Sequence, residues 1–126
     1  MIWIDSSFAI EWLLGTERAK KADFKKESPA ILPMQYMETF VFFLKMKLDP
    51  IRIANELEAL ELIQPVKPHL QEASFLYREA RLRKSKASMA DAILAAVAYE
   101  RKEKVASFDR DFDSLGLKAK GLFWYP

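Results

Sequence analysis

Three aspartates stand at alternate positions in the segment SFDRDFD, residues 107–113, which follows a short apolar stretch. Alternating carboxylates are typical of a cation-binding loop, and these three have the spacing of the first ligands of an EF-hand. An EF-hand loop also needs a glycine at its sixth position and a glutamate at its twelfth, where this chain has Ser114 and Lys120. The EF-hand is therefore excluded, and a cation bound at this segment would need ligands from elsewhere in the chain.

Glu38 stands in an otherwise apolar segment, PMQYMETFVFFLKMK. On a helix it would share a face with Met34, Val41 and Phe42. A carboxylate ion among apolar side chains is costly unless it meets a cation or several hydrogen-bond donors. Two explanations stay open: an ion pair with Lys45 or another base at the helix edge, or a role as a cation ligand.

Asp91 lies within a second apolar segment, SMADAILAAVAYE, residues 88–100. The spacing Ser88-x-x-Asp91 resembles a capping box, in which the carboxylate is stabilised by the N-terminus of the helix. Capping alone would explain this aspartate. A capping role and a ligand role are compatible, because the first turn of a helix can both orient a carboxylate and open onto a cleft.

The composition restricts the available chemistry to oxygen ligands. The chain has no cysteine, which excludes disulfides, thiolate metal sites and thiol nucleophiles. Its single histidine, His69, follows Pro68 at an expected helix start and is predicted to lie at the surface. One imidazole is little material for a zinc site or a Ser-His-Asp triad. Oxygen ligands alone favour Mg²⁺ or Mn²⁺ over zinc or copper.

The length and composition predict one globular domain, residues 1–126. Of these residues 51% are apolar and 30% charged, which is typical of a folded chain rather than a disordered one. The longest apolar run, residues 40–44, is far too short to span a membrane. The first residues also lack the basic flank and apolar core of a signal peptide. We therefore expect a cytoplasmic protein without membrane association.

Strands and helices are predicted to alternate along the chain. The predicted strands are residues 1–5, 30–32, 63–66, 104–107 and 121–125. The predicted helices are residues 6–15, with Ser6 or Ser7 as cap, and 16–27, 33–48, 50–62, 68–84 and 88–102. This alternation predicts an α/β fold of three layers, a mostly parallel central sheet with helices on both faces. Sites in such folds form outside the carboxyl ends of strands, so Asp5 and Asp109 are expected at the same edge.

Basic residues gather in the segment REARLRKSK, residues 78–86. Against one acidic residue it carries five basic ones: Arg78, Arg81, Arg83, Lys84 and Lys86. A basic stripe of this kind can hold phosphates. A solvated helix end explains the same pattern equally well, so both interpretations stay open.

Several segments in their order and spacing resemble the PIN-domain ribonucleases, particularly the small VapC-type toxins of prokaryotic toxin–antitoxin pairs. They are IWIDSS at the start, the acid at position 38, SMADAILAAVAYE, and VASFDRDF near the end, and the resemblance covers nearly the whole chain. It implies a PIN-like fold in which four acids form a magnesium or manganese site that cuts RNA; the matching residues are Asp5, Glu38, Asp91 and Asp109. Ser7 matches a small hydroxyl residue beside the first aspartate, and Ser107 stands where threonine is more usual. Asp111 is an additional acid, expected beside the site or as a helix cap, and Asp113 is expected in solvent.

The resemblance also implies chemistry and partners. Divalent ions at such a site polarise the scissile phosphate and activate the attacking water, so no side-chain nucleophile is required. The basic residues expected to guide the RNA backbone at the rim are Arg81, Arg83, Lys84 and Lys86. Toxins of this type usually pair with a small antitoxin that lies in an apolar groove and blocks the metal site, and they commonly form homodimers. Candidates for apolar surface near the early helices are Trp12, Leu13, Phe42 and Phe43.

Other classes of protein share parts of this pattern. A PIN-like domain without activity could act as a binding or scaffold module, and an assay with added metal separates it from the ribonuclease. A receiver-type phosphoacceptor would have a second acid next to Asp5, where Ser6 and Ser7 stand. A haloacid-dehalogenase-type phosphatase would have D-x-D after its first strand, whereas the D-x-D of this chain, residues 109–111, comes near the other end.

Overall fold

The computed structural model of the protein describes residues 1–22 and 27–124. In this part of the chain, five parallel strands form one sheet in the order β3-β2-β1-β4-β5. They are β1 (Ile2–Ile4), β2 (Pro29–Ile31), β3 (Glu61–Leu62), β4 (Lys104–Ala106) and β5 (Phe123–Trp124). Ile4 pairs with Ala106 in the central strands β1 and β4. The residues that follow these two strands therefore lie side by side, as the parallel sheet predicted from the sequence requires.

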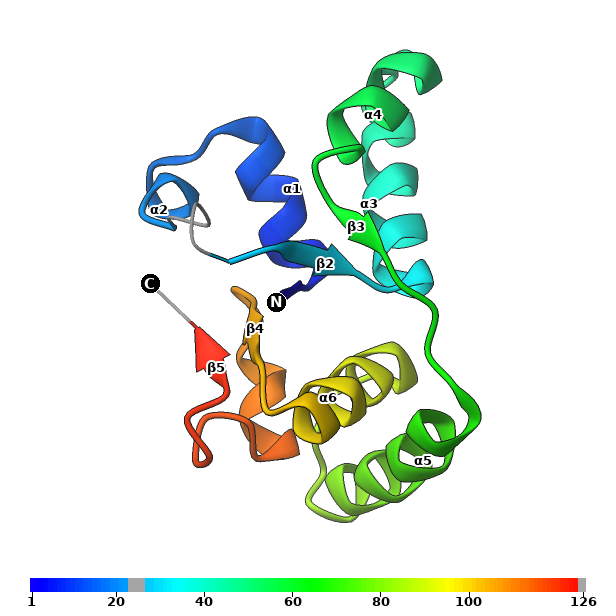
Figure 1. The fold of residues 1–126 in the computed structure, drawn as a ribbon, viewed down its shortest axis with the longest axis vertical. Coiled ribbons are helices and arrows are strands. Elements are labelled where there is room, and N and C mark those ends of the chain that lie inside the picture. The colour runs from blue at the N-terminus through cyan, green and yellow to red at the C-terminus, as the bar shows by residue number, and fades with distance from the viewer. Residues whose placement is uncertain (23–26, 125–126) are drawn as a thin grey trace.

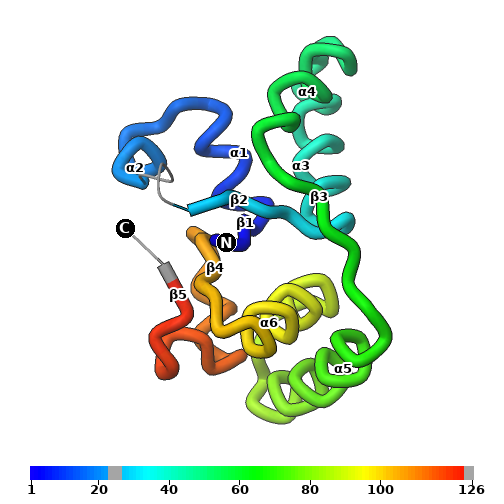
Figure 2. The backbone as a smooth tube through the Cα atoms, viewed as in Figure 1, coloured from blue at the N-terminus to red at the C-terminus, as the bar shows by residue number. Residues whose placement is uncertain are grey.

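Helices cover both faces of the sheet. They are α1 (Ser6–Leu14), α2 (Glu17–Lys20), α3 (Pro33–Lys45), α4 (Pro50–Leu57), α5 (Lys67–Leu82) and α6 (Met89–Arg101), and a 3₁₀ helix, η1, spans Arg110–Leu115. Figure 1 shows α1, α3 and α4 on one side of the sheet and α5 and α6 on the other, and the tube in Figure 2 follows the same three layers. The predicted α/β fold of three layers is confirmed. Within the described ranges, no helix is both long enough and apolar enough to cross a membrane.

Each helix layer has its own hydrophobic core, because the side chains of a strand point alternately to the two faces of a sheet. In β1, Ile2 and Ile4 pack with residues of α1, α3 and α4, whereas Trp3 packs with residues of α5, α6 and η1. The buried face of α6 is rich in alanine, which lets this helix approach the sheet and α5 closely. Side chains of α3 and of α6 are thus anchored in different cores.

Two predicted helices are longer than the observed ones. The helix predicted for residues 16–27 is the short α2, and residues 23–26 lie outside the described part of the chain. The helix predicted for residues 50–62 ends at Leu57, and the strand predicted for residues 63–66 is wrong, because β3 lies just before it at Glu61–Leu62. The reason is Leu60, which is buried in the core on the α1 side and whose amide donates to the Leu57 carbonyl in a tight turn. Of the predicted strand 121–125, the residues of β5 are confirmed and residue 125 lies outside the described part.

Two predictions about helix ends are wrong. The N-cap residue of α1 is Asp5, and neither Ser6 nor Ser7 caps the helix, because the Ser7 hydroxyl donates to the Asp5 carboxylate instead. His69 is buried rather than at the surface. Its Nδ1 accepts from the Val66 amide at 3.0 Å, and its Nε2 lies 2.8 Å from Oε2 of Glu100 without the alignment of a hydrogen bond. The close packing of α5 on α6 covers this imidazole, which a sequence pattern alone does not reveal.

Candidate metal centre at the carboxyl edge of the sheet

Asp5 directly follows β1 and is only 3% exposed. Its Oδ2 accepts hydrogen bonds from the hydroxyls of Ser7 and Ser107, both at 2.8 Å. Burial raises the pKa of the Asp5 carboxyl above its usual value, the serine hydroxyls act in the opposite direction, and the charge of Asp109 raises it further. The carboxylate is thus held in one orientation at the centre of the sheet edge.

The two serines also tie the end of β4 to the start of α1. Their hydroxyl oxygens lie 3.1 Å apart. The Ser7 hydroxyl accepts from the amide of Phe108 at 3.0 Å, and the Ser107 hydroxyl accepts from the amide of Asp109 at 2.9 Å. Asp5 and Asp109 are therefore fixed relative to each other through hydroxyls that contact both segments. Both bonds of Ser107 are made by its hydroxyl, which serine and threonine share, so the replacement of the more usual threonine by serine keeps them.

Glu38 reaches the same region from α3. The pKa of its carboxyl is raised, first by burial and then by the charge of Asp5, which places the two acids within electrostatic reach. Glu38 is nevertheless exposed, as are its neighbours Met34 and Val41, so the expectation that apolar side chains enclose it is wrong. Across residues 1–22 and 27–124 it has no ion pair, so the alternative of an ion pair with Lys45 or another base is not observed there.

Asp91 lies in the first turn of α6, and the predicted capping box is present. Its Oδ2 accepts from the Ser88 amide at 2.9 Å, and the Ser88 hydroxyl accepts from the Asp91 amide at 3.1 Å. Burial raises the pKa of Asp91 to about 7 against the lowering effect of the Ser88 amide, and the charges of Asp5 and Asp109 add to the rise. The capping residue is therefore also part of the acidic cluster.

Asp109 is the N-cap residue of η1, and its Oδ1 accepts from the Asp111 amide at 2.9 Å. The pKa of the Asp111 carboxyl is raised by burial and by Asp109, while Lys86 lowers it. Asp111 thus lies beside Asp109, and Asp113 is exposed, as expected. An additional acid at this position increases the negative charge around Asp109.

These four acids, Asp5, Glu38, Asp91 and Asp109, fit a divalent cation by the chemistry of their oxygens. All are carboxylates, the chain has no thiol, and none of them pairs with a lysine or arginine among the described residues. Their mutual electrostatic effects indicate a region of concentrated negative charge. As the side chains lie, no three acidic or histidine groups in the described part of the chain are close enough to hold one ion. A shared ion therefore requires side-chain rotation, for which the exposed Glu38 has the most freedom.

The basic segment ends close to η1. Arg83 Nη2 donates to the Ser114 carbonyl at 2.5 Å, and the guanidinium of Arg81 lies 5.0 Å from the ring centre of Tyr77. Lys86 is near enough to Asp111 to lower its pKa. The predicted basic residues Arg81, Arg83, Lys84 and Lys86 are all exposed. Of these four, Lys86 is the one whose charge acts on an acid of this region, and Arg83 contacts the end of η1.

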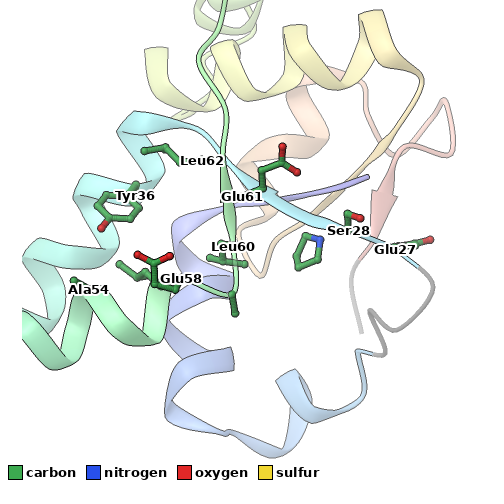
Figure 3. A pocket seen from close by; sticks show the side chains of 11 residues that line it. Glu27, Ser28, Tyr36, Ala54, Glu58, Leu60, Glu61 and Leu62 are labelled. Carbon is green, nitrogen blue, oxygen red and sulfur yellow. The ribbon is translucent and has the colours of Figure 1, made fainter.

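The open hollow in Figure 3 is at a different place in the fold. It has a volume of about 660 Å³ and is lined by residues at the amino ends of β2 and β3 and by the end of α4. Glu58 and Glu61 line it together with Tyr36. Its lining includes the residues where β2 and β3 begin, whereas Asp5 follows the end of β1, so the hollow is separate from the acidic residues.

A role for Gln35, a buried polar residue on the helix that carries Glu38, was not predicted from the sequence. Gln35, on α3, is fully buried, and its Nε2 donates to the carbonyl of Ala90 at 3.0 Å. In the sequence, Gln35 is recognisable only as an amide side chain three residues before Glu38 in an apolar helix. This pattern alone does not tell whether the residue is buried or exposed.

A model of the PIN-domain family matches residues 2–118 of the sequence. The chain belongs to the PIN-domain family. Three solved structures share the fold of this PIN domain. A toxin–antitoxin complex from Klebsiella pneumoniae is 21% identical, with a TM-score of 0.71 over 89% of this chain and 90% of that one. VapC20 of Mycobacterium tuberculosis, a toxin that cleaves the sarcin–ricin loop, is 20% identical, with a TM-score of 0.71 over 92% and 95% of the two chains.

The third structure is VapBC2 from Rickettsia felis bound to a DNA fragment from its promoter. It is 13% identical to this PIN domain, with a TM-score of 0.70 over 90% of this chain and 92% of that one. No curated protein matches the sequence. At these identities the likeness establishes the fold, which the three structures share over nearly the full length of the chain.

Proposed function

We propose that this PIN domain is a Mg²⁺- or Mn²⁺-dependent endoribonuclease and the toxin of a toxin–antitoxin pair. The observation that carries the proposal is the electrostatic coupling of Asp5 to Glu38, Asp91 and Asp109, which come from different elements. A buried carboxylate such as Asp5, with other acids around it and no cationic partner, is costly, and a divalent cation is the group that offsets this cost. The family, and the activity of VapC20, favour RNA as the substrate.

The residues of the chain have separable roles in this proposal. A bound Mg²⁺ or Mn²⁺ would polarise the scissile phosphate and lower the pKa of a water. Asp5, held by Ser7 and Ser107, presents Oδ1 in a fixed direction, because Oδ2 is occupied by both hydroxyls. Asp91 can take up a proton at Oδ1, since Oδ2 accepts from Ser88. The basic residues at the end of α5 attract the RNA backbone toward the acids.

A small antitoxin is part of the proposal, since two of the similar structures are toxin–antitoxin complexes. A narrow groove between α1 and α4 is lined by apolar side chains together with Arg52 and Glu56; the apolar ones are Leu13, Leu14, Phe43, Leu48 and Ile53. An apolar segment of an antitoxin would be recognised here by burial of its side chains. Of the four residues predicted to provide apolar surface, Leu13 and Phe43 line this groove.

A homodimer is also proposed. The exposed side of α3 carries apolar residues at the spacing of one helical stripe: Met34, Met37, Val41 and Leu44. A stripe of this kind is normally covered by another helix, and a second copy of α3 would cover it around a two-fold axis.

An inactive binding module is the second candidate, because no three ligands are close enough to share an ion among the described side chains. A cleavage assay separates the two. Purified protein should cut single-stranded or structured RNA in Mn²⁺ or Mg²⁺, and a chelator should stop the reaction. Cleavage that continues in excess chelator would falsify the metal-dependent mechanism, and intact RNA in every metal would favour the binding module.

A further inference from the structure

We propose that Gln35 is a positioning residue that sets the separation between Glu38 and Asp91 and thereby the affinity of the carboxylate site for a divalent cation. The inference rests on the proposed metal-dependent function. Gln35 would not contact the cation itself. It acts through the two acids, which belong to different helices on opposite sides of the sheet.

The contact that supports this role joins the two helices directly. Gln35 is 0% exposed, and its Nε2 donates to the carbonyl of Ala90 at 3.0 Å. Among the hydrogen bonds that join described residues, it is the one that connects α3 to α6. Ala90 immediately precedes Asp91, and Gln35 precedes Glu38 by less than one helical turn. The bond therefore lies next to both acids.

Hydrophobic packing contributes to this restraint only at Leu32, the N-cap residue of α3, which is buried in the same core as α6; the apolar side chains within α3 belong to the other core. Phe43 of α3 packs with α1 and α4, whereas Leu94 of α6 packs with α5 and the other face of the sheet. Small shifts of one layer against the other are therefore opposed by the sheet, by Leu32 and by this hydrogen bond, and Gln35 is closer to Glu38 in the helix than Leu32 is. The acceptor is a main-chain carbonyl of α6, so the bond restrains the backbone of the helix rather than a mobile side chain. Burial strengthens such a bond, since water does not compete for it.

The side-chain amide of Gln35 lowers the stability of the fold. Its Oε1 is buried and has no hydrogen-bond partner among the described residues. An unpaired buried acceptor lowers stability, so an apolar side chain of similar length would pack there at a smaller cost. If Gln35 served packing alone, its replacement by methionine should make the protein more stable and leave its function intact. A positioning residue should lose function in the same replacement.

The test uses Gln35→Met, with Thr39→Val as the matched control. Thr39 is also fully buried on α3, but its hydroxyl donates to the Gln35 carbonyl within the same helix and does not reach α6. Because the chain has no cysteine, spin labels can be attached to cysteines introduced at Lys45 and Met89, which are exposed on α3 and α6 and lie outside the stripe proposed for the homodimer. Electron paramagnetic resonance in chelator then measures the spread of the inter-helix distance without paramagnetic Mn²⁺, and calorimetry measures Mn²⁺ binding to the unlabelled proteins.

We expect Gln35→Met to broaden the label distance distribution, to weaken Mn²⁺ binding on the order of 10-fold and to leave the metal-free melting temperature unchanged or higher. Thr39→Val should alter neither the distribution nor the Mn²⁺ affinity. Gln35→Asn, which keeps the amide but is too short to reach Ala90, should broaden the distance distribution and weaken Mn²⁺ binding as Gln35→Met does, but with a lower melting temperature, because its amide is then buried without a partner.

Three results would overturn the inference. They are unchanged distance distributions and Mn²⁺ affinity in both Gln35 variants, unfolding of both variants, or an equal loss of affinity in Thr39→Val. Wild-type protein that binds no Mn²⁺ defeats the proposed function, and the claim about affinity falls with it. The distance measurement still decides whether Gln35 holds the two helices together, so the two failures are distinguishable.

Discussion

Asp5 is the residue on which the proposed site depends, because it is buried and lies within the electrostatic reach of the other three acids. Two serine hydroxyls orient it, but neutral donors compensate a buried charge less well than a cation does. Without an ion, the cluster is therefore a source of instability in the fold. A group that neutralises the acids should stabilise the protein, whether it is a divalent cation or a proton.

The proton provides the first prediction, at Asp91. Its pKa is about 7 in the fold against an ordinary 3.8 for an aspartate side chain, so at intermediate pH the folded protein binds a proton that the unfolded chain releases. Stability without divalent ions should therefore rise as pH falls from 8 to 5, by at most about 3 kcal/mol from this group, since about two pH units of the interval lie below its pKa. Asp91→Asn should lose most of this gain, whereas Asp113→Asn, on the exposed side of η1, should keep it. Thermal melts in chelator check this, and a wild-type melting temperature that falls over the same interval would rule it out.

The elements that carry the acids differ in how well the sequence predicts them. Helices α3 and α6 follow from Pro33 at a first turn and from the box formed by Ser88 and Asp91. Asp5 and Asp109 are placed at one edge because both follow strands of a parallel sheet. The position of His69 could not be predicted in the same way, since its burial depends on the packing of α5 against α6 rather than on local pattern.

The buried face of α3 could not be predicted either. This helix is apolar nearly all round, so periodicity does not decide which side faces the core. The structure buries Gln35 and Thr39 while Met34 and Val41 are exposed. Polar residues are thus buried while apolar ones are exposed. Gln35 is buried because it donates a hydrogen bond to α6, and the exposed apolar residues belong to the surface proposed to contact a second copy.

The end of α5 carries the second prediction. Changing Arg81, Lys84 and Lys86 together to alanine should weaken RNA binding and reduce the salt slope of the binding constant by up to about 2, at roughly 0.7 for each lost contact to single-stranded phosphate. Arg83 is left in place because it donates to Ser114 and supports η1. Salt-dependent binding titrations make the comparison.

The control for this triple variant replaces three exposed lysines in the other helix layer, Lys20, Lys21 and Lys45, with alanine. Net charge then changes by the same amount at a different place. If both triple variants lose the same affinity and slope, the basic segment is only part of a diffuse positive charge, and its direct contact with RNA is refuted.

At the scale of the whole molecule, the third prediction concerns the exposed stripe on α3. Met37→Lys and Val41→Glu place charges on a surface that is 59% and 45% exposed at these positions, so neither should unfold the monomer. If the stripe is the homodimer interface, each change should convert the dimer to monomer in sedimentation experiments. Phe75→Lys, which alters an apolar residue 65% exposed on α5, is the control and should remain dimeric. A wild-type monomer, or a dimer that survives both α3 changes, contradicts the assignment.

The three layers of the fold explain why this site is an assembly of distant segments. Glu38 comes from the layer on one side of the sheet, Asp91 from the layer on the other, and Asp5 and Asp109 from the strands between them. No single element could provide this constellation, which requires the complete fold. Binding of one cation by acids from all three layers is thus the central claim.

The most direct test is calorimetric titration of Mn²⁺ into wild-type protein and four single variants: Asp5→Asn, Glu38→Gln, Asp91→Asn and Asp109→Asn. Asp113→Asn is the matched control, because Asp113 is exposed in η1 and is not counted among the four acids. We predict that wild type and the control bind Mn²⁺ alike and that each of the four variants binds at least about 10-fold more weakly, as expected when one carboxylate ligand is lost. Undiminished binding in the four variants, or an equal loss in Asp113→Asn, would contradict the claim that these acids hold one cation between the three layers.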